Sequence, residues 1–99
     1  MRQGPFGAIA VSDKDKQWGW AIERASEADA QSAAMASCKA RDCYVSVILQ
    51  GMCGAIVRGD DLIEYWGRMP TRAEAESRAL TECQAKTTGC TVMVWACSF

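Results

Sequence analysis

The chain has 99 residues, of which 49% are hydrophobic and 23% are charged, and its net charge is −1. This composition is typical of a folded domain and is wrong for a disordered chain. Basic and acidic residues are scattered without a block of one sign, which excludes the basic surface that a nucleic-acid binder needs. No apolar run approaches the roughly 20 residues that cross a bilayer, which excludes a membrane span.

The first half of the chain predicts a hairpin, a helix and a third strand. Residues 8–11 and 18–22 are rich in β-forming residues and flank a polar turn, so they indicate a hairpin. Ser26 is an N-cap residue, and the alanine-rich sequence after it predicts a helix that ends at Asp42. Residues 43–49 are mostly apolar and predict a buried strand.

The second half of the chain repeats this order with an offset of about 47 residues. Thr71 and Glu74 form a capping box, which predicts the start of the second helix. The matching segments are Gly7-Ala8-Ile9-Ala10 with Gly54-Ala55-Ile56-Val57, Trp18-Gly19 with Trp66-Gly67, and Val45-Ser46-Val47 with Val92-Met93-Val94.

The sequence therefore predicts an α+β fold with about six strands and two helices, built from a duplicated strand-strand-helix-strand unit. We expect a single domain over residues 6–99, with copies at 6–50 and 53–99. Residues 1–5 are expected to be a disordered or cloning-derived N-terminus, from which a leader has been removed.

Six cysteines in so short a chain indicate a disulfide framework and an oxidising compartment. The repeat narrows the pairings, because Cys38 and Cys43 occupy the same places as Cys83 and Cys90. Each of these pairs would join a helix end to the strand that follows it. The remaining two cysteines, Cys53 and Cys97, have no repeat counterparts. We expect them to pair with each other and to join two neighbouring strands.

A zinc site is the alternative use of the four repeated cysteines, Cys38, Cys43, Cys83 and Cys90. Ligands in structural zinc sites are usually two to four residues apart within each pair, and histidine is a common ligand. Here the second pair is more widely spaced, and the chain contains no histidine. Disulfides are the favoured interpretation, and we expect no metal and no cofactor.

Several motifs follow one another along the chain: Phe6-Gly7-Ala8-Ile9-Ala10, Trp18-Gly19-Trp20, Cys43-x-Val45, Cys53-Gly54-Ala55-Ile56, Thr71-Arg72-Ala73-Glu74-Ala75, and the closing segment from Cys90 to Cys97. Together they resemble a known family, the small bacterial exported domains of domain-of-unknown-function family 4189. The resemblance covers about residues 5 to 98 and implies a periplasmic or secreted bacterial protein. It implies no catalytic residues, since the family has no assigned activity.

The sequence offers little catalytic chemistry. Without histidine, a Ser-His or Cys-His nucleophile is impossible within the chain. Asp60 and Asp61 follow a glycine, and Asp13 and Asp15 lie in the equivalent turn of the first copy. They could form a carboxylate pair for hydrolysis or a calcium site. A solvated turn is the favoured interpretation, because a calcium loop needs six or more oxygen ligands in order.

Four tryptophans are the remaining candidates for function. Trp18 and Trp66 are repeat equivalents, and with Trp95 they are expected to lie in the core between sheet and helix. Trp20 has no aromatic counterpart, and core burial is favoured for it too. An exposed Trp20 beside Tyr65 or Arg68 would instead anchor an interface.

The sequence thus predicts an exported, non-catalytic binding protein with a protein partner, for example an inhibitor or immunity-type protein that neutralises a secreted toxin or hydrolase. The alternatives are an envelope module that binds glycans through its tryptophans and a small carboxylate-dependent hydrolase. The predicted interaction surface comprises Trp20, Asp60, Asp61, Tyr65 and Arg68.

Overall fold

A computed structural model describes residues 4–12 and 17–99. Most of the N-terminal segment predicted at residues 1–5 therefore lies outside the described residues. So do Asp13 and Asp15, the candidate calcium ligands of the first hairpin turn.

The elements follow the predicted order, strand-strand-helix-strand, twice. The structure thus confirms the α+β fold with six strands and two helices. The first copy contains β1 (Phe6–Ser12), β2 (Gln17–Arg24), α1 (Glu27–Ser37) and β3 (Tyr44–Gln50), and the second contains β4 (Met52–Arg58), β5 (Glu64–Met69), α2 (Arg72–Gln84) and β6 (Thr91–Ser98).

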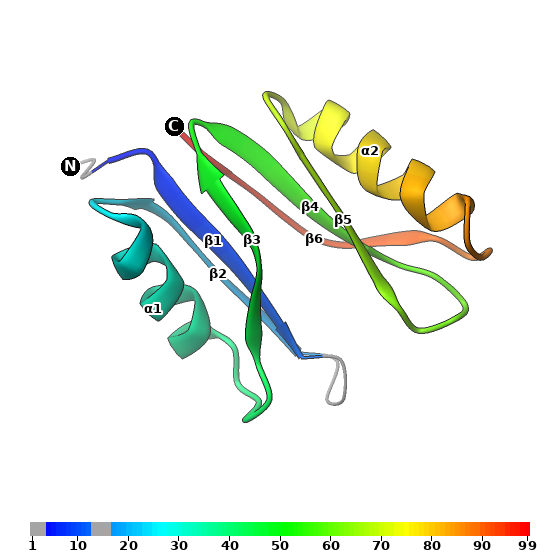
Figure 1. The fold of residues 1–99 in the computed structure, drawn as a ribbon, viewed down its shortest axis with the longest axis horizontal. Coiled ribbons are helices and arrows are strands. Elements are labelled where there is room, and N and C mark those ends of the chain that lie inside the picture. Colours follow the sequence, from blue (N-terminus) through cyan, green and yellow to red (C-terminus); the bar gives the residue numbers. More distant parts are fainter. Residues whose placement is uncertain (1–3, 13–16) are drawn as a thin grey trace.

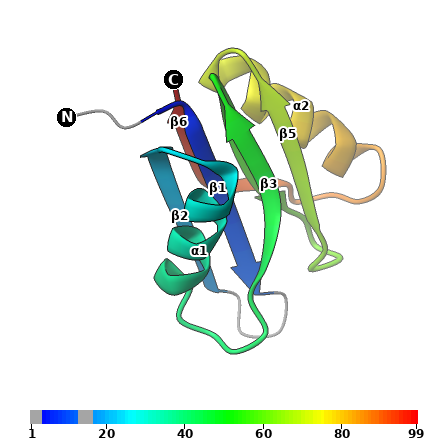
Figure 2. The same ribbon diagram turned by 60° about the vertical axis from the view of Figure 1, so that its left-hand side comes forward.

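Each copy forms its own antiparallel sheet with one helix against it. The strand orders are β2-β1-β3 and β5-β4-β6, so the repeated Gly-Ala-Ile strand is central in both sheets. The two sheets face each other, and α1 and α2 cover their outer faces, which gives four layers (Figure 1). Figure 2 shows α1 lying across β1 and β2.

The core follows from the alternation of side chains along the central strands. In β1, Ile9 and Val11 point between the sheets, where they pack with residues of both copies, including Leu49 and Ile56. The intervening alanines face α1 and belong to a separate cluster with the helix alanines. Large residues therefore fill the space between the sheets, and small residues let each helix lie close to its sheet.

Two repeat-equivalent glycines mark where each helix touches an edge strand. A Cβ on Gly19 would lie 2.3 Å from the Cys38 nitrogen, and a Cβ on Gly67 would lie 2.3 Å from the Ala75 carbonyl oxygen. Both contacts are to helix or helix-cap backbone, which cannot move aside as a side chain can. The paired Trp-Gly motif thus fixes the distance between each helix and its sheet.

The helix starts confirm the predicted caps, but the end of α1 does not lie where expected. The Ser26 hydroxyl accepts a hydrogen bond from the Asp29 amide (3.1 Å), and Thr71 accepts one from the Glu74 amide (3.2 Å). The prediction that α1 ends at Asp42 is wrong, because the helix stops at Ser37. Cys38 turns into an extended conformation there, and its disulfide partner is only five residues on.

The structure joins all six cysteines in three disulfides, with none free. They are Cys38–Cys43, Cys83–Cys90 and Cys53–Cys97, the pairs that the repeat indicates. Cys53 and Cys97 are direct register partners on β4 and β6, with their Cα atoms 3.9 Å apart. The four cysteines of the alternative zinc site are therefore oxidised, and they lie in separate packing clusters.

Candidate functional site

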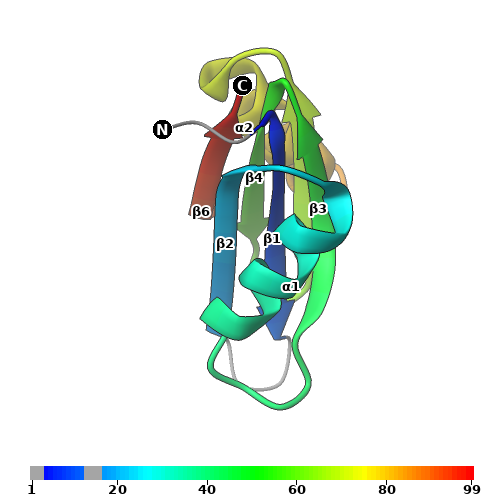
Figure 3. The same cartoon turned by 90° about the vertical axis from the view of Figure 1, so that its left-hand side faces the viewer.

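The two sheets leave two narrow faces on the molecule where free strand edges lie near each other. At one, β2 lies near β6; at the other, β3 lies near β5. Figure 3 shows β2 and β6 along one side and β3 along the other. We call these the β2/β6 face and the β3/β5 face. Because β2 matches β5 and β3 matches β6 in the repeat, the two faces are equivalent by duplication.

The prediction that Trp18, Trp66 and Trp95 are core residues is wrong, because their side chains are 36%, 49% and 41% exposed. Trp18 and Trp66 each precede the glycine that lies under a helix, so their indoles point to the opposite side of an edge strand. An edge strand has sheet on one side only, which leaves such an indole half covered. Trp95 lies on the outer face of its sheet, the face that α2 covers, and the Arg72 guanidinium of α2 stacks 3.8 Å from the centre of its ring.

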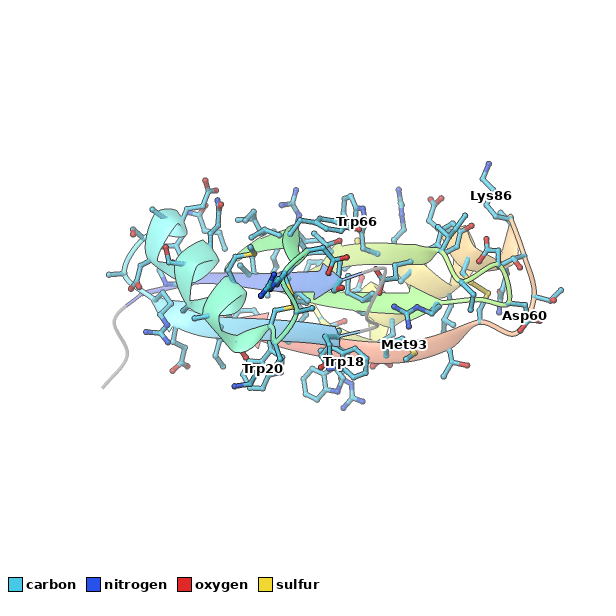
Figure 4. The ribbon with its side chains drawn as sticks, turned by 90° about the horizontal axis from the view of Figure 1, so that it is seen from below. Trp18, Trp20, Asp60, Trp66, Lys86 and Met93 are labelled. Carbon is cyan, nitrogen blue, oxygen red and sulfur yellow. A yellow bond between two sulfur atoms is a disulfide. The ribbon has the colours of Figure 1, made fainter. Side chains whose placement is uncertain are left out.

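Trp20 is also exposed, at 48%, against the favoured expectation of core burial. It projects from the β2/β6 face together with Trp18 and near Met93, whereas Trp66 lies on the opposite side of the molecule (Figure 4). Trp20 is therefore not beside Tyr65 or Arg68, which line a cleft with Trp66. The predicted interaction surface is thus divided between two faces.

The β2/β6 face carries a groove of about 500 Å³. Trp20 and Ile22 line it from β2, and residues 93–97 line it from β6. None of these lining residues carries an ionisable side chain, since the only cysteine among them is disulfide-bonded. The groove is therefore an exposed apolar surface bounded by aromatic rings.

The β3/β5 face differs in the residue that replaces Trp20. Arg68 occupies the equivalent position, and its guanidinium donates a hydrogen bond to the Ile48 carbonyl of β3 (2.9 Å). The adjoining cleft has a volume of about 510 Å³. It is lined by Glu64, Tyr65, Trp66, Arg68, Met69, Arg78 and Glu82. Duplication has thus produced one apolar face and one charged face.

Asp60 and Asp61 both hold the turn between β4 and β5. The Asp60 carboxylate accepts a hydrogen bond from the Thr88 hydroxyl (2.9 Å). The Asp61 carboxylate accepts one from the Ile63 amide (3.1 Å) and one from the Tyr65 hydroxyl (2.7 Å). The hydrogen bond to Asp61 raises the pKa of Tyr65 above its ordinary value of 10.0, because it stabilises the protonated phenol. The two carboxylates have different partners, as expected for a structural turn.

One buried ion pair escaped the sequence analysis. Arg58 ends β4 and Glu64 begins β5, and the two are register partners whose side chains are only 8% and 5% exposed. Their guanidinium and carboxylate groups are in contact, which joins the two strand ends beneath the turn. Sequence alone gave no signal for this pair, because an arginine and a glutamate near a polar turn are usually exposed.

The sequence of β2 contains a signal that predicts which of its residues face the groove. Small residues, Gly19 and Ala21, alternate along β2 with Trp18, Trp20 and Ile22. A strand with its small residues under a helix must present its large residues on the opposite face. Met93 gave no such signal, because it lies at a break in the register between β4 and β6.

Within residues 4–12 and 17–99, no group of three or more potential metal ligands converges. Neither helix in this part of the chain is long and apolar enough to cross a membrane. A family model described as a domain of unknown function, DUF4189, matches residues 6–97. No curated protein and no solved structure matches the chain.

Proposed function

The chain belongs to the DUF4189 family, and we propose that it is an exported, non-catalytic binding protein that holds a protein partner at the β2/β6 groove. Three disulfides support export, because structural disulfides form and persist mainly in oxidising compartments. They also support a binding role, because a rigid surface loses little conformational entropy when a partner binds.

The observation that carries this proposal is the pair of indoles beside an apolar groove. Trp18 and Trp20 project from the same edge strand, and the groove beside Trp20 has no ionisable lining residue. Tryptophan is enriched among the residues that dominate binding energy in protein interfaces. A contiguous exposed apolar surface is also costly to leave in water, which supports its being covered in the working state.

An inhibitor or immunity-type role fits this surface best among binding roles. Such proteins block a toxin or hydrolase through a preorganised surface and need no chemistry of their own. The β2/β6 groove would receive an apolar segment of the target, and the exposed Trp18 and Trp20 would pack against it. The charged β3/β5 face would remain in solvent.

Site-specific photocrosslinking tests the proposal. A photoreactive benzoylphenylalanine replaces Trp20 in one variant and Trp66 in a control variant, and both are expressed in the cells of origin. The control is well matched, because the two indoles are 48% and 49% exposed and lie on opposite faces. We expect one discrete protein adduct from position 20 that unlabelled protein competes away, and none from position 66. Equal adducts from both positions, or none from position 20, would contradict the proposal.

The purified partner then allows a quantitative test. Trp20→Ala should weaken binding by about 30-fold, which corresponds to a loss of about 2 kcal/mol for an interface anchor. Trp66→Ala should change the dissociation constant by less than about twofold.

A glycan-binding envelope module is the second candidate, and the β3/β5 cleft favours it. Trp66 offers an exposed aromatic ring there, and Arg68 and Glu82 offer polar groups for sugar hydroxyls. Cell-wall glycan fragments should then change the tryptophan fluorescence of the wild type but leave that of Trp66→Phe unchanged. The carboxylate-dependent hydrolase gains no support from the turn, because Asp60 and Asp61 already have separate structural partners. Loss of a hydrolytic activity in Asp60→Asn or Asp61→Asn would restore that candidate.

A further inference from the structure

We propose that the partner docks through an extended strand that adds to the free edge of β6, with alternate side chains in the groove. This inference rests on the proposed function, since it specifies how the protein partner binds. Strand addition supplies affinity through main-chain hydrogen bonds and specificity through the alternate side chains.

The register of β6 shows which of its backbone groups point outward. In antiparallel sheets the close Cα pairs, about 4.5 Å apart, are those that do not exchange hydrogen bonds. Cys53 and Cys97 form such a pair, at 3.9 Å. The N–H and C=O groups of Cys97 therefore point away from β4, and those of Trp95, two residues earlier, point the same way. Because β6 pairs with β4 alone, these groups lie on a free edge.

The duplicated half supports this assignment and shows what is different about β6. Ile48 is the repeat equivalent of Trp95, and its carbonyl points outward and accepts the hydrogen bond from Arg68. Trp20 takes the place of that arginine on the β2/β6 face. Among the described residues, no side chain is seen to donate to the Trp95 carbonyl. The edge of β3 is therefore closed by a side-chain hydrogen bond, whereas the equivalent edge of β6 is open.

The residues of β6 also lack two of the usual protections of an edge strand, charge and proline. Proteins commonly protect free edges with charged residues, with proline or with bulges. The eight residues Thr91–Ser98 contain no charge and no proline. The register is irregular only near Met93, and Val94–Ser98 pair regularly with β4. The Ser98 hydroxyl accepts a hydrogen bond from the Glu23 amide of β2 (2.8 Å), so the free edge for an added strand runs from Val94 to Cys97.

The groove determines the chemistry of the docking strand. An added strand would lie about 4.8 Å beyond β6, opposite the overhanging indoles of Trp18 and Trp20. Its inward side chains would be buried against residues without charge, where an ionised group would lose its hydration without gaining a partner. The segment is therefore a strand that is apolar and uncharged at every second position, and its other positions face solvent.

A second copy of the chain suits this edge less well than a single strand. In antiparallel two-fold pairing, the commoner kind, two β6 strands would lie side by side and bring the two β2 strands together. The Trp18 and Trp20 indoles of both copies would then compete for the same space. A single added strand brings no opposing sheet, so it can cover both indoles.

A synthetic peptide tests the mode of docking. The probe is an acetylated and amidated peptide of eight residues, the length of β6, that alternates valine with threonine. In an extended strand, alternate amides face opposite edges. N-methylation of the valine amides in one analogue, and of the threonine amides in another, should therefore give unequal results. We expect one analogue to lose at least about tenfold in affinity, or about 1.4 kcal/mol, and the other to lose less than about twofold.

Protein variants complete the test. Trp20→Arg reproduces the residue of the closed face and should abolish peptide binding while the protein stays folded. Trp66→Ala, on the opposite face, should bind like the wild type. Sedimentation should show a monomer with or without peptide.

Each contrary result has a distinct meaning. Equal affinity of both N-methylated analogues, or no binding of the parent peptide at millimolar concentration, overturns strand addition. If position 20 still crosslinks to a protein in cells, the proposed function survives that failure. A dimer that Trp20→Arg dissociates would identify a second copy as the occupant and would also overturn the inference. Loss of both the crosslink and peptide binding would remove both proposals together.

Discussion

The Cys53–Cys97 disulfide should contribute more stability than either of the other two. It joins residues 44 apart in sequence, whereas Cys38–Cys43 and Cys83–Cys90 span 5 and 7. A crosslink stabilises mainly by restricting the unfolded chain, and its effect grows with the logarithm of the loop length. The loop lengths give about 4 kcal/mol for the long loop and about 2 kcal/mol for each short one.

The comparison uses three double variants in which each cysteine pair is replaced by alanine. Each pair has at least one buried cysteine, and in Cys38–Cys43 both are buried. A cavity cost therefore adds to all three variants, and the excess loss in the Cys53/Cys97 variant measures the effect of loop length. Urea unfolding at constant temperature gives the free energy of unfolding from the midpoint and slope. Removal of about 4 kcal/mol from a domain of typical stability, about 5–15 kcal/mol, should leave the Cys53/Cys97 variant marginally folded.

If the three variants lost equal stability, or if a short-loop variant lost the most, chain entropy would not be the main source of the stabilisation. The slope of the unfolding transition serves as an internal check. It should increase when the long crosslink is removed, because the unfolded chain then exposes more surface.

Four further predictions concern single residues. Gly67→Ala should destabilise the protein by about 1–3 kcal/mol in urea unfolding, because the added Cβ would meet helix backbone at 2.3 Å. Gly51→Ala should cost about 1 kcal/mol in the same assay, because Gly51 has open space around it but a φ of +66°. Asp61→Asn should return the raised pKa of Tyr65 towards 10.0 in an absorbance titration. In the wild type, the stabilisation linked to this phenol is present below pH 10.0 and is lost as the pH rises through the folded-state pKa of Tyr65. If Tyr65 titrated in the variant as it does in the wild type, the hydrogen bond to Asp61 would not be the cause of the raised pKa. Trp20→Arg should change the free energy of unfolding by less than about 1 kcal/mol, because the indole is half exposed; a larger loss would mean that Trp20 is a core residue.

The sequence predicted the order of strands and helices, but not the arrangement of the strands in two sheets, because duplication is visible in local motifs. Ser26 and Thr71 mark the helix starts by side-chain chemistry that acts over three residues. Two of the cysteine pairs followed from the repeat, and Cys53–Cys97 was the pair left over. Helix caps and repeated motifs involve residues close together in the chain, so they can be recognised from one sequence.

The tryptophans could not be placed in the same way, because burial at a sheet edge depends on the opposing layer. Alternation along β2 tells which face Trp18 and Trp20 share, but not how far the facing sheet extends. The two sheets have three strands each, so no strand of the described residues covers the outer half of an edge indole. The ion pair of Arg58 and Glu64 was missed for a related reason, since its burial results from packing around the turn.

The two departures from the repeat converge on the same strand, which bears on how the β2/β6 face works. One is Trp20, which stands where the second copy has Arg68 and leaves the edge of β6 open. The other is the disulfide to Cys97, whose register equivalent in the first copy is the uncrosslinked pair Phe6 and Gln50. An edge strand that accepts another strand must itself stay in register, or the two would exchange or slip. A covalent bond between β4 and β6 at the open edge prevents that slip without placing a charge where a docking strand would lie. The protected β3 edge, already closed by an arginine, has no such requirement and no such bond.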